Sequence, residues 1–150
     1  MDTILDYFCE GFFIMNELIE LSAQLHLIFI VVLIGLIFIN LYLLKSDKTF
    51  FNLSKRLELI APQYYIVLSA IFFTGLIVMA VRQFSFSLIV WEMIIAWVVI
   101  VGLGIKNHKL YKKARLDAGS QNAYKALAFR KYLLDLALVV ITIVLFYTVH

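Results

Sequence analysis

The stretch Leu21–Leu44, LSAQLHLIFIVVLIGLIFINLYLL, decides the fold. It contains no Asp, Glu, Lys or Arg. It also exceeds the ~20 apolar residues that a helix needs to cross a hydrocarbon core of ~30 Å. Backbone amides and carbonyls find no water at that depth, so a segment of this length must satisfy them inside a helix. The stretch therefore predicts a transmembrane helix.

Three further apolar runs of similar character follow it, and together they predict an all-α, polytopic membrane four-helix bundle. The predicted spans are 21–44, 60–81, 88–105 and 132–149. Hydrophobic residues make up 64% of the chain, against about 45–50% in soluble domains. A single helix from the N-terminus to Leu44 would overshoot the bilayer. We therefore expect an N-terminal interfacial helix over 1–20 and a transmembrane domain over 21–150.

The basic residues predict the orientation of the chain. All 13 Lys and Arg follow the first span: four lie in the first loop, one in the second and eight in the third. The positive-inside rule then places the first and third loops in the cytoplasm and both termini outside. Anionic lipid headgroups are the expected partners of these loops, in preference to nucleic acid. A chain of this size also suits a homodimer.

An ionisable side chain inside a span is costly unless it is paired, so each one needs an explanation. The polar candidates inside the predicted spans are His26, Asn40, Glu92 and Asp135. His26 and Glu92 both lie a few residues into spans that enter from the outer side. We therefore predict that they meet and interact. Asp135 lies near the cytoplasmic end of its span, where an ion pair with Arg130 or Lys131 is expected.

His26 has four interpretations: haem ligand, copper ligand, proton relay, or an imidazole that only ties helices together. Glu92 strengthens the catalytic interpretation, in which His26 and Glu92 are both catalytic residues. Met79 and Met93 fall near the same predicted depth. Met93 is accordingly a candidate second ligand to a b-type haem. His26, Met79 and Met93 together are candidate ligands for copper, since His and Met suit Cu(I).

Other chemistry is excluded by the motifs that are missing. A haem with two histidine ligands from one chain is excluded, because His108 and His150 lie at or beyond the ends of spans. No H-E-x-x-H, Walker A or G-x-S-x-G pattern occurs. Cys9 is the single cysteine, which excludes an intrachain disulfide.

Local signals refine the spans. Pro62 is expected in the first turn of the second helix, where its missing N–H matters little. Tyr64 and Tyr65 are expected at the membrane interface. The glycines expected to act as packing notches between helices are Gly35, Gly75, Gly102 and Gly104. The segment 119–122 is expected to separate two helices that extend out of the membrane.

Two stretches resemble the group that contains HemJ-type protoporphyrinogen oxidases and CopD-type copper-resistance proteins. Leu25-His26-Leu27, followed by Gly35-Leu36-Ile37-Phe38, resembles the first helix of that group. The segment from Arg56 through Pro62 to Thr74-Gly75-Leu76 is similar to the second. The order and spacing of the last two helices also match, so the resemblance covers about residues 21–149.

The resemblance implies a function. HemJ-type proteins oxidise protoporphyrinogen IX in the bacterial inner membrane, are thought to carry a b-type haem and need the histidine that aligns with His26. CopD-type proteins are associated with copper movement. Two positions depart from the group: Glu92 stands where a Lys is usual, and Leu33 replaces a Trp. The leading expectation is a haem-binding oxidoreductase of this kind, and the alternatives are a copper-transport component and a non-catalytic membrane subunit.

Overall fold

The chain folds into four long helices. The computed structural model describes residues 2–46, 49–82 and 87–149, with α1 at Asp2–Lys45, α2 at Phe50–Val81, α3 at Leu88–Leu116 and α4 at Gln121–Val149. A short 3-10 helix, η1 (Ala118–Ser120), joins α3 to α4. No strand occurs in these ranges, and the predicted all-α fold is confirmed. Lys48 and His150, used in the predictions above, lie outside the described residues.

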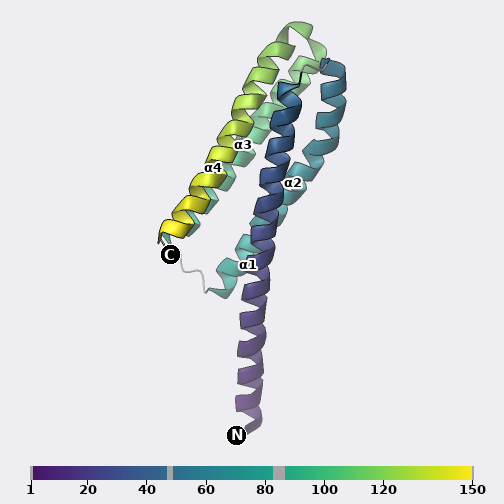
Figure 1. The fold of residues 1–150 in the computed structure, drawn as a ribbon. Coiled ribbons are helices and arrows are strands. Elements are labelled where there is room, and N and C mark those ends of the chain that lie inside the picture. The colour runs from purple at the N-terminus through teal and green to yellow at the C-terminus, as the bar shows by residue number, and fades with distance from the viewer. Residues whose placement is uncertain (1, 47–48, 83–86, 150) are drawn as a thin grey trace.

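All four helices are long and apolar enough to cross a membrane, so this is a multi-pass membrane protein. α1 packs against α2 and α4, and α3 packs against α4 (Figure 1). We call the end of the bundle where α1 ends, α2 begins and η1 lies the basic end. The opposite end, where α2 ends and α3 begins, is the distal end. Helices α1 and α3 run from the distal end towards the basic end, whereas α2 and α4 run the other way.

Three helices extend further at the basic end than the predicted spans. α2 begins at Phe50 because its first turns bury Leu53 and Leu57, which are 0% and 6% exposed. The prediction that Pro62 lies in the first turn was therefore wrong, and Pro62 lies inside α2. α3 continues to Leu116 and α4 already begins at Gln121, so the predicted pair of extensions is confirmed.

The connection between α3 and α4 is organised by Asp117. Its carboxylate accepts hydrogen bonds from the Ser120 hydroxyl (2.7 Å) and the Gly119 amide (3.1 Å). These bonds, the Ser120 bond foremost, lower the pKa of Asp117. Lys113 and Arg115 lie in the last turn of α3, where cations interact favourably with the helix dipole. The break near Gly119 thus has a local cause that the sequence indicated.

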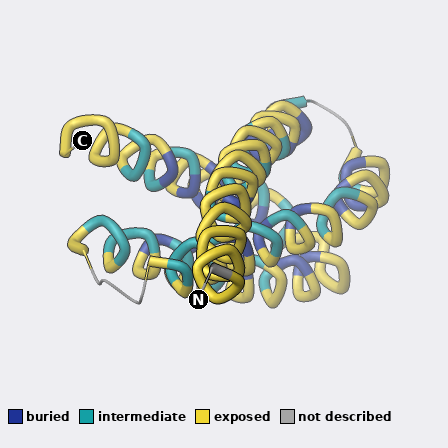
Figure 2. Tube along the Cα trace, turned by 90° about the horizontal axis from the view of Figure 1, so that it is seen from below, coloured by how far each residue is buried: buried dark blue, intermediate teal, exposed yellow. Residues whose placement is uncertain are grey.

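α1 is one continuous helix from Asp2 to Lys45, and the interfacial position expected for the segment 1–20 stays a prediction. Its 44 residues span about 66 Å at 1.5 Å per residue. The N-terminal part extends alone beyond the distal end of the other helices (Figure 1). It is exposed along almost its whole length (Figure 2). No proline interrupts the sequence, so nothing local ends the helix between the segment 2–20 and the bundle.

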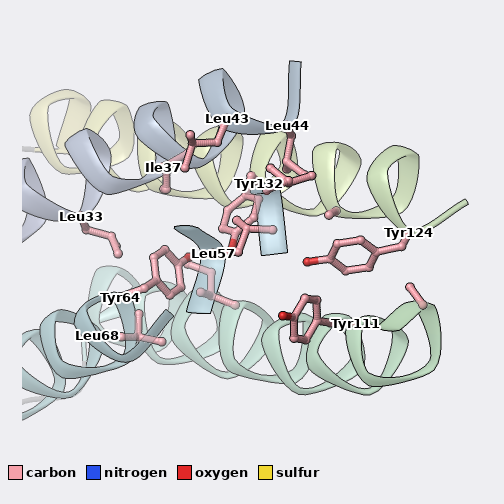
Figure 3. Close-up of a cluster of buried hydrophobic side chains, with 14 of the residues drawn as sticks. Leu33, Ile37, Leu43, Leu44, Leu57, Tyr64, Leu68, Tyr111, Tyr124 and Tyr132 are labelled. Carbon is pink, nitrogen blue, oxygen red and sulfur yellow. The ribbon is translucent and has the colours of Figure 1, made fainter. Parts of the chain in front are cut away.

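The hydrophobic core lies mainly in the half of the bundle nearer the basic end. Leu33, Ile37, Leu57, Tyr64 and Leu68 are among its members (Figure 3). Tyrosine rings from three helices extend this core towards the basic end, where Tyr111 and Tyr124 have ring centroids 5.6 Å apart. Few residues are buried in the distal half, which contains His26 and Glu92.

Candidate functional site: a histidine and a carboxylate at one depth

His26 is fixed by a hydrogen bond to the neighbouring helix. Its Nδ1 lies 2.9 Å from the Thr74 hydroxyl oxygen on α2. The Thr74 hydroxyl donates its own proton to the Ala70 carbonyl, 2.8 Å away. When that proton is on the bond to Ala70, the Thr74 oxygen accepts from His26, and the ring N–H is at Nδ1. In that tautomer the lone pair is on Nε2.

Gly75 provides the space for the His26 ring. A Cβ atom at Gly75 would lie 3.4 Å from His26 Cε1, and one at Gly104 would lie 3.0 Å from the Tyr65 hydroxyl. These two glycines therefore act as packing notches, as predicted. A Cβ at Gly35 or Gly102 would meet no described atom within 4 Å, so the prediction for these two was wrong.

Glu92 has one partnered and one unpartnered oxygen. The Thr142 hydroxyl on α4 lies 2.9 Å from Glu92 Oε1 and donates to it. Glu92 Oε2 is buried and has no hydrogen-bond partner among the described residues. A buried acceptor without a donor costs about 1–3 kcal/mol. Such an atom in a native protein calls for a ligand, a water molecule or a proton.

The expected contact between His26 and Glu92 is not formed. His26 bonds to Thr74 and Glu92 to Thr142, and no hydrogen bond or ion pair joins the two within the described ranges. The reason is the order of packing. α1 lies against α2 and α4, whereas α3 lies against α4. Each polar side chain therefore finds a threonine on an adjacent helix before it can reach the other.

The two residues nevertheless lie at about the same depth. The Trp97 indole N–H on α3 donates to the Leu68 carbonyl on α2, 3.1 Å away, which aligns these two helices. Glu92 precedes Trp97 by five residues, about 7.5 Å towards the distal end. Thr74, which holds His26, follows Leu68 by six residues, about 9 Å in the same direction. The bundle thus carries an imidazole on one side and a carboxylate on the other at one level.

The predicted methionine ligands are partly buried, but no recorded contact links Met79 or Met93 to His26. In the part of the chain that is described, no group of three or more His, Cys, Asp or Glu side chains could hold a metal ion. Copper binding by His26, Met79 and Met93 therefore stays a prediction without geometric support. The same holds for Met93 as a second haem ligand.

A second polar cluster, which the sequence only partly indicated, joins α2 to α4 in the core. Asp135 Oδ2 accepts from the Tyr64 hydroxyl at 2.6 Å and pairs with Lys131 Nζ at 2.5 Å. The ammonium also lies 4.4 Å from the ring centroid of Tyr64 and 4.2 Å from that of Tyr132. Asp135 is 0% and Lys131 6% exposed. This ion pair is almost completely removed from solvent.

The sequence predicted that Asp135 would pair with Arg130 or Lys131 at the end of a span, and Lys131 is the partner in the structure. It missed Tyr64, which was expected at the interface and is 2% exposed. Asn40 on α1 is also buried, and its amide donates to the Leu36 carbonyl at 2.8 Å. The early starts of α2 and α4 explain these differences for Tyr64 and Asp135, because they turn residues expected near helix ends into residues of a helix interior.

Comparisons with protein-family models, curated proteins and solved structures found no match to this chain. The resemblance to the HemJ and CopD group therefore stays a prediction from the sequence motifs around His26 and Gly75.

Proposed function

We propose that this protein is a bacterial inner-membrane haem protein with a redox role, related to the porphyrinogen-oxidising HemJ group. The hydrogen bond from His26 Nδ1 to Thr74 is the observation that carries this proposal. Histidines that bind metals commonly donate their other ring N–H to a protein acceptor, which fixes the tautomer and the ring orientation. Thr74 provides that acceptor here and leaves Nε2 as the ligating atom.

The residues fit a single b-type haem with one histidine ligand from this chain. His26 is half-buried in the distal half of the bundle, where little else is packed. His108 is exposed near the basic end and is too far along the bundle to share one iron with His26. When bound, haem iron supplies one-electron chemistry. The chain's own part is to present Nε2 and keep the ring in place through Thr74.

Glu92 is the residue that we assign to proton handling. Oxidation of a porphyrinogen releases protons together with electrons, and Glu92 Oε2 is a buried acceptor without a partner at the level of His26. A carboxylate suits an N–H donor and disfavours a porphyrin propionate, since like charges repel. The replacement of the usual Lys by Glu92 therefore favours contact with a pyrrole N–H over contact with a propionate.

The proposed orientation follows from charge. The two loops at the basic end, with the helix turns beside them, hold 12 of the 13 Lys and Arg residues, and Arg82 alone lies at the distal end. We therefore assign the basic end to the cytoplasm and the level of His26 to the outer half of the membrane.

The absorption spectrum of the purified protein tests the proposal. With haemin supplied during expression, we expect a Soret band that is lost in His26→Ala and retained in the control His108→Ala. A Soret band that persists in His26→Ala would overturn the assignment. Bound copper without a Soret band would favour the transport alternative, and neither signal would favour a non-catalytic membrane subunit.

A further inference from the structure

A groove at the basic end lies between the first turns of α2 and the end of α3. Its volume is about 650 Å³, and Phe50, Phe51, Lys55, Glu58 and Arg115 are among the residues that line it. A smaller groove of about 360 Å³ adjoins it, and Lys55 lines both. The two grooves form one continuous surface that combines aromatic and charged side chains.

This surface has more available positive charge than negative charge. Its one acid, Glu58, is already occupied, because Oε1 pairs with Arg115 at 2.8 Å and accepts from the Tyr111 hydroxyl at 3.0 Å. Lys55 and Arg56 are exposed, and the described residues contain no ion pair for either of them. Two adjacent cations are therefore available to an anion from outside the chain.

The depth of these cations matches the lipid headgroups. Lys55 precedes Ile60, the first residue of the apolar run on α2, by five residues, about 7.5 Å along the helix. The headgroup layer extends roughly 5–8 Å beyond each face of the hydrocarbon core. Leu59, which is 66% exposed and lines the smaller groove, lies on the side of the hydrocarbon. The cations lie at the level of a phospholipid headgroup, and the exposed apolar side chain lies at the level of its acyl chains.

We infer that this surface binds an anionic phospholipid, with Lys55 and Arg56 on the phosphodiester and an acyl chain along Leu59. Phe50 and Phe51 line the larger groove beside Lys55. The inference does not depend on haem binding, since the groove and His26 are at opposite ends of the bundle.

The test uses the full chain in vesicles of equal parts phosphatidylcholine and phosphatidylglycerol, with pure phosphatidylcholine as reference. Spin-labelled lipids report the association constant of each lipid with the protein. We expect a preference for phosphatidylglycerol that falls roughly 30-fold in the double variant Lys55→Gln/Arg56→Gln, because each basic residue near the surface attracts anionic lipid separately.

A matched control is Lys109→Gln/Lys112→Gln, which removes two exposed basic residues at a similar distance beyond the apolar run of α3. It should keep most of the preference, and both variants should keep the helical circular dichroism of the parent. An equal loss in the control, or no preference in the parent, would overturn the inference. Displacement of the bound lipid by free glycerol phosphate at equal concentration would also overturn it, because the acyl chain would then contribute nothing.

Discussion

The two halves of this bundle hold their polar side chains in different surroundings. Near the basic end, Asp135, Lys131 and Tyr64 share one carboxylate oxygen inside a packed core. In the distal half, His26 bonds to Thr74, Glu92 bonds to Thr142, and Glu92 Oε2 has no hydrogen-bond partner among the described residues. Among the described residues, Asp135 Oδ1 and Glu92 Oε2 are both buried without a hydrogen-bond partner, so the two regions differ in packing and in charge pairing: Asp135 has a buried counter-ion in the core, whereas Glu92 forms no ion pair with a described residue.

The largest expected effect is the loss of stability when the buried ion pair of Asp135 and Lys131 is broken. Asp135→Ala leaves the Lys131 ammonium buried without its counter-ion and should lower the free energy of unfolding by about 3–5 kcal/mol. Replacement of both partners, Lys131→Met with Asp135→Leu, should restore most of that loss, because no uncompensated charge is left. Denaturation in detergent, followed by helical circular dichroism, measures both. A double variant as unstable as the single one would show that the pair does more than support packing.

Thr74→Val should have the next largest effect. It removes the acceptor of the His26 Nδ1–H and should cost about 1–3 kcal/mol, the usual penalty for a buried donor without a partner. The proton should also be free to move to Nε2, which ¹⁵N NMR of the imidazole detects. Thr142→Val is the control, since it acts on Glu92 and should leave the His26 tautomer unchanged. The same tautomer in Thr74→Val would contradict the proposed positioning.

Alanine substitutions at two glycines should change the unfolding free energy less than Thr74→Val does, and they should differ from each other. Gly102→Ala should stabilise the helix by about 0.5–1 kcal/mol, because alanine is the better helix former and the position is open. Gly75→Ala should gain less or lose stability, since its new methyl group meets the His26 ring at 3.4 Å. Equal gains at both positions would indicate that the ring of His26 is not closely packed on α2.

The smallest effect is expected from the exposed end of α1. Deletion of residues 2–18, with an initiating Met retained, removes side chains that are all exposed where described. The unfolding free energy of the bundle should then change by no more than about 0.5 kcal/mol, as for ordinary surface changes. A larger loss would show that this segment packs on the bundle in solution.

Sequence reasoning located the four spans because apolar length alone determines them. It also located His26 and Glu92, because charge inside such a span is rare. It could not find the partners of these residues, since hydrophobicity does not specify which helices are neighbours. Pro62 and Tyr64 were misplaced for a related reason: α2 and α4 continue past the apolar runs, and only tertiary packing shows that Leu53 and Leu57 are buried there.

The unbroken course of α1 has a mechanical consequence. From Phe8 to His26 the helix measures about 27 Å, and no joint lies between them. A rotation of the whole rod by about 6° about His26 would carry Phe8 sideways by roughly 3 Å, given that length. The protruding segment and His26 therefore lie on one unbroken helix, so a tilt of that segment would also tilt the backbone that carries the ring bonded to Thr74.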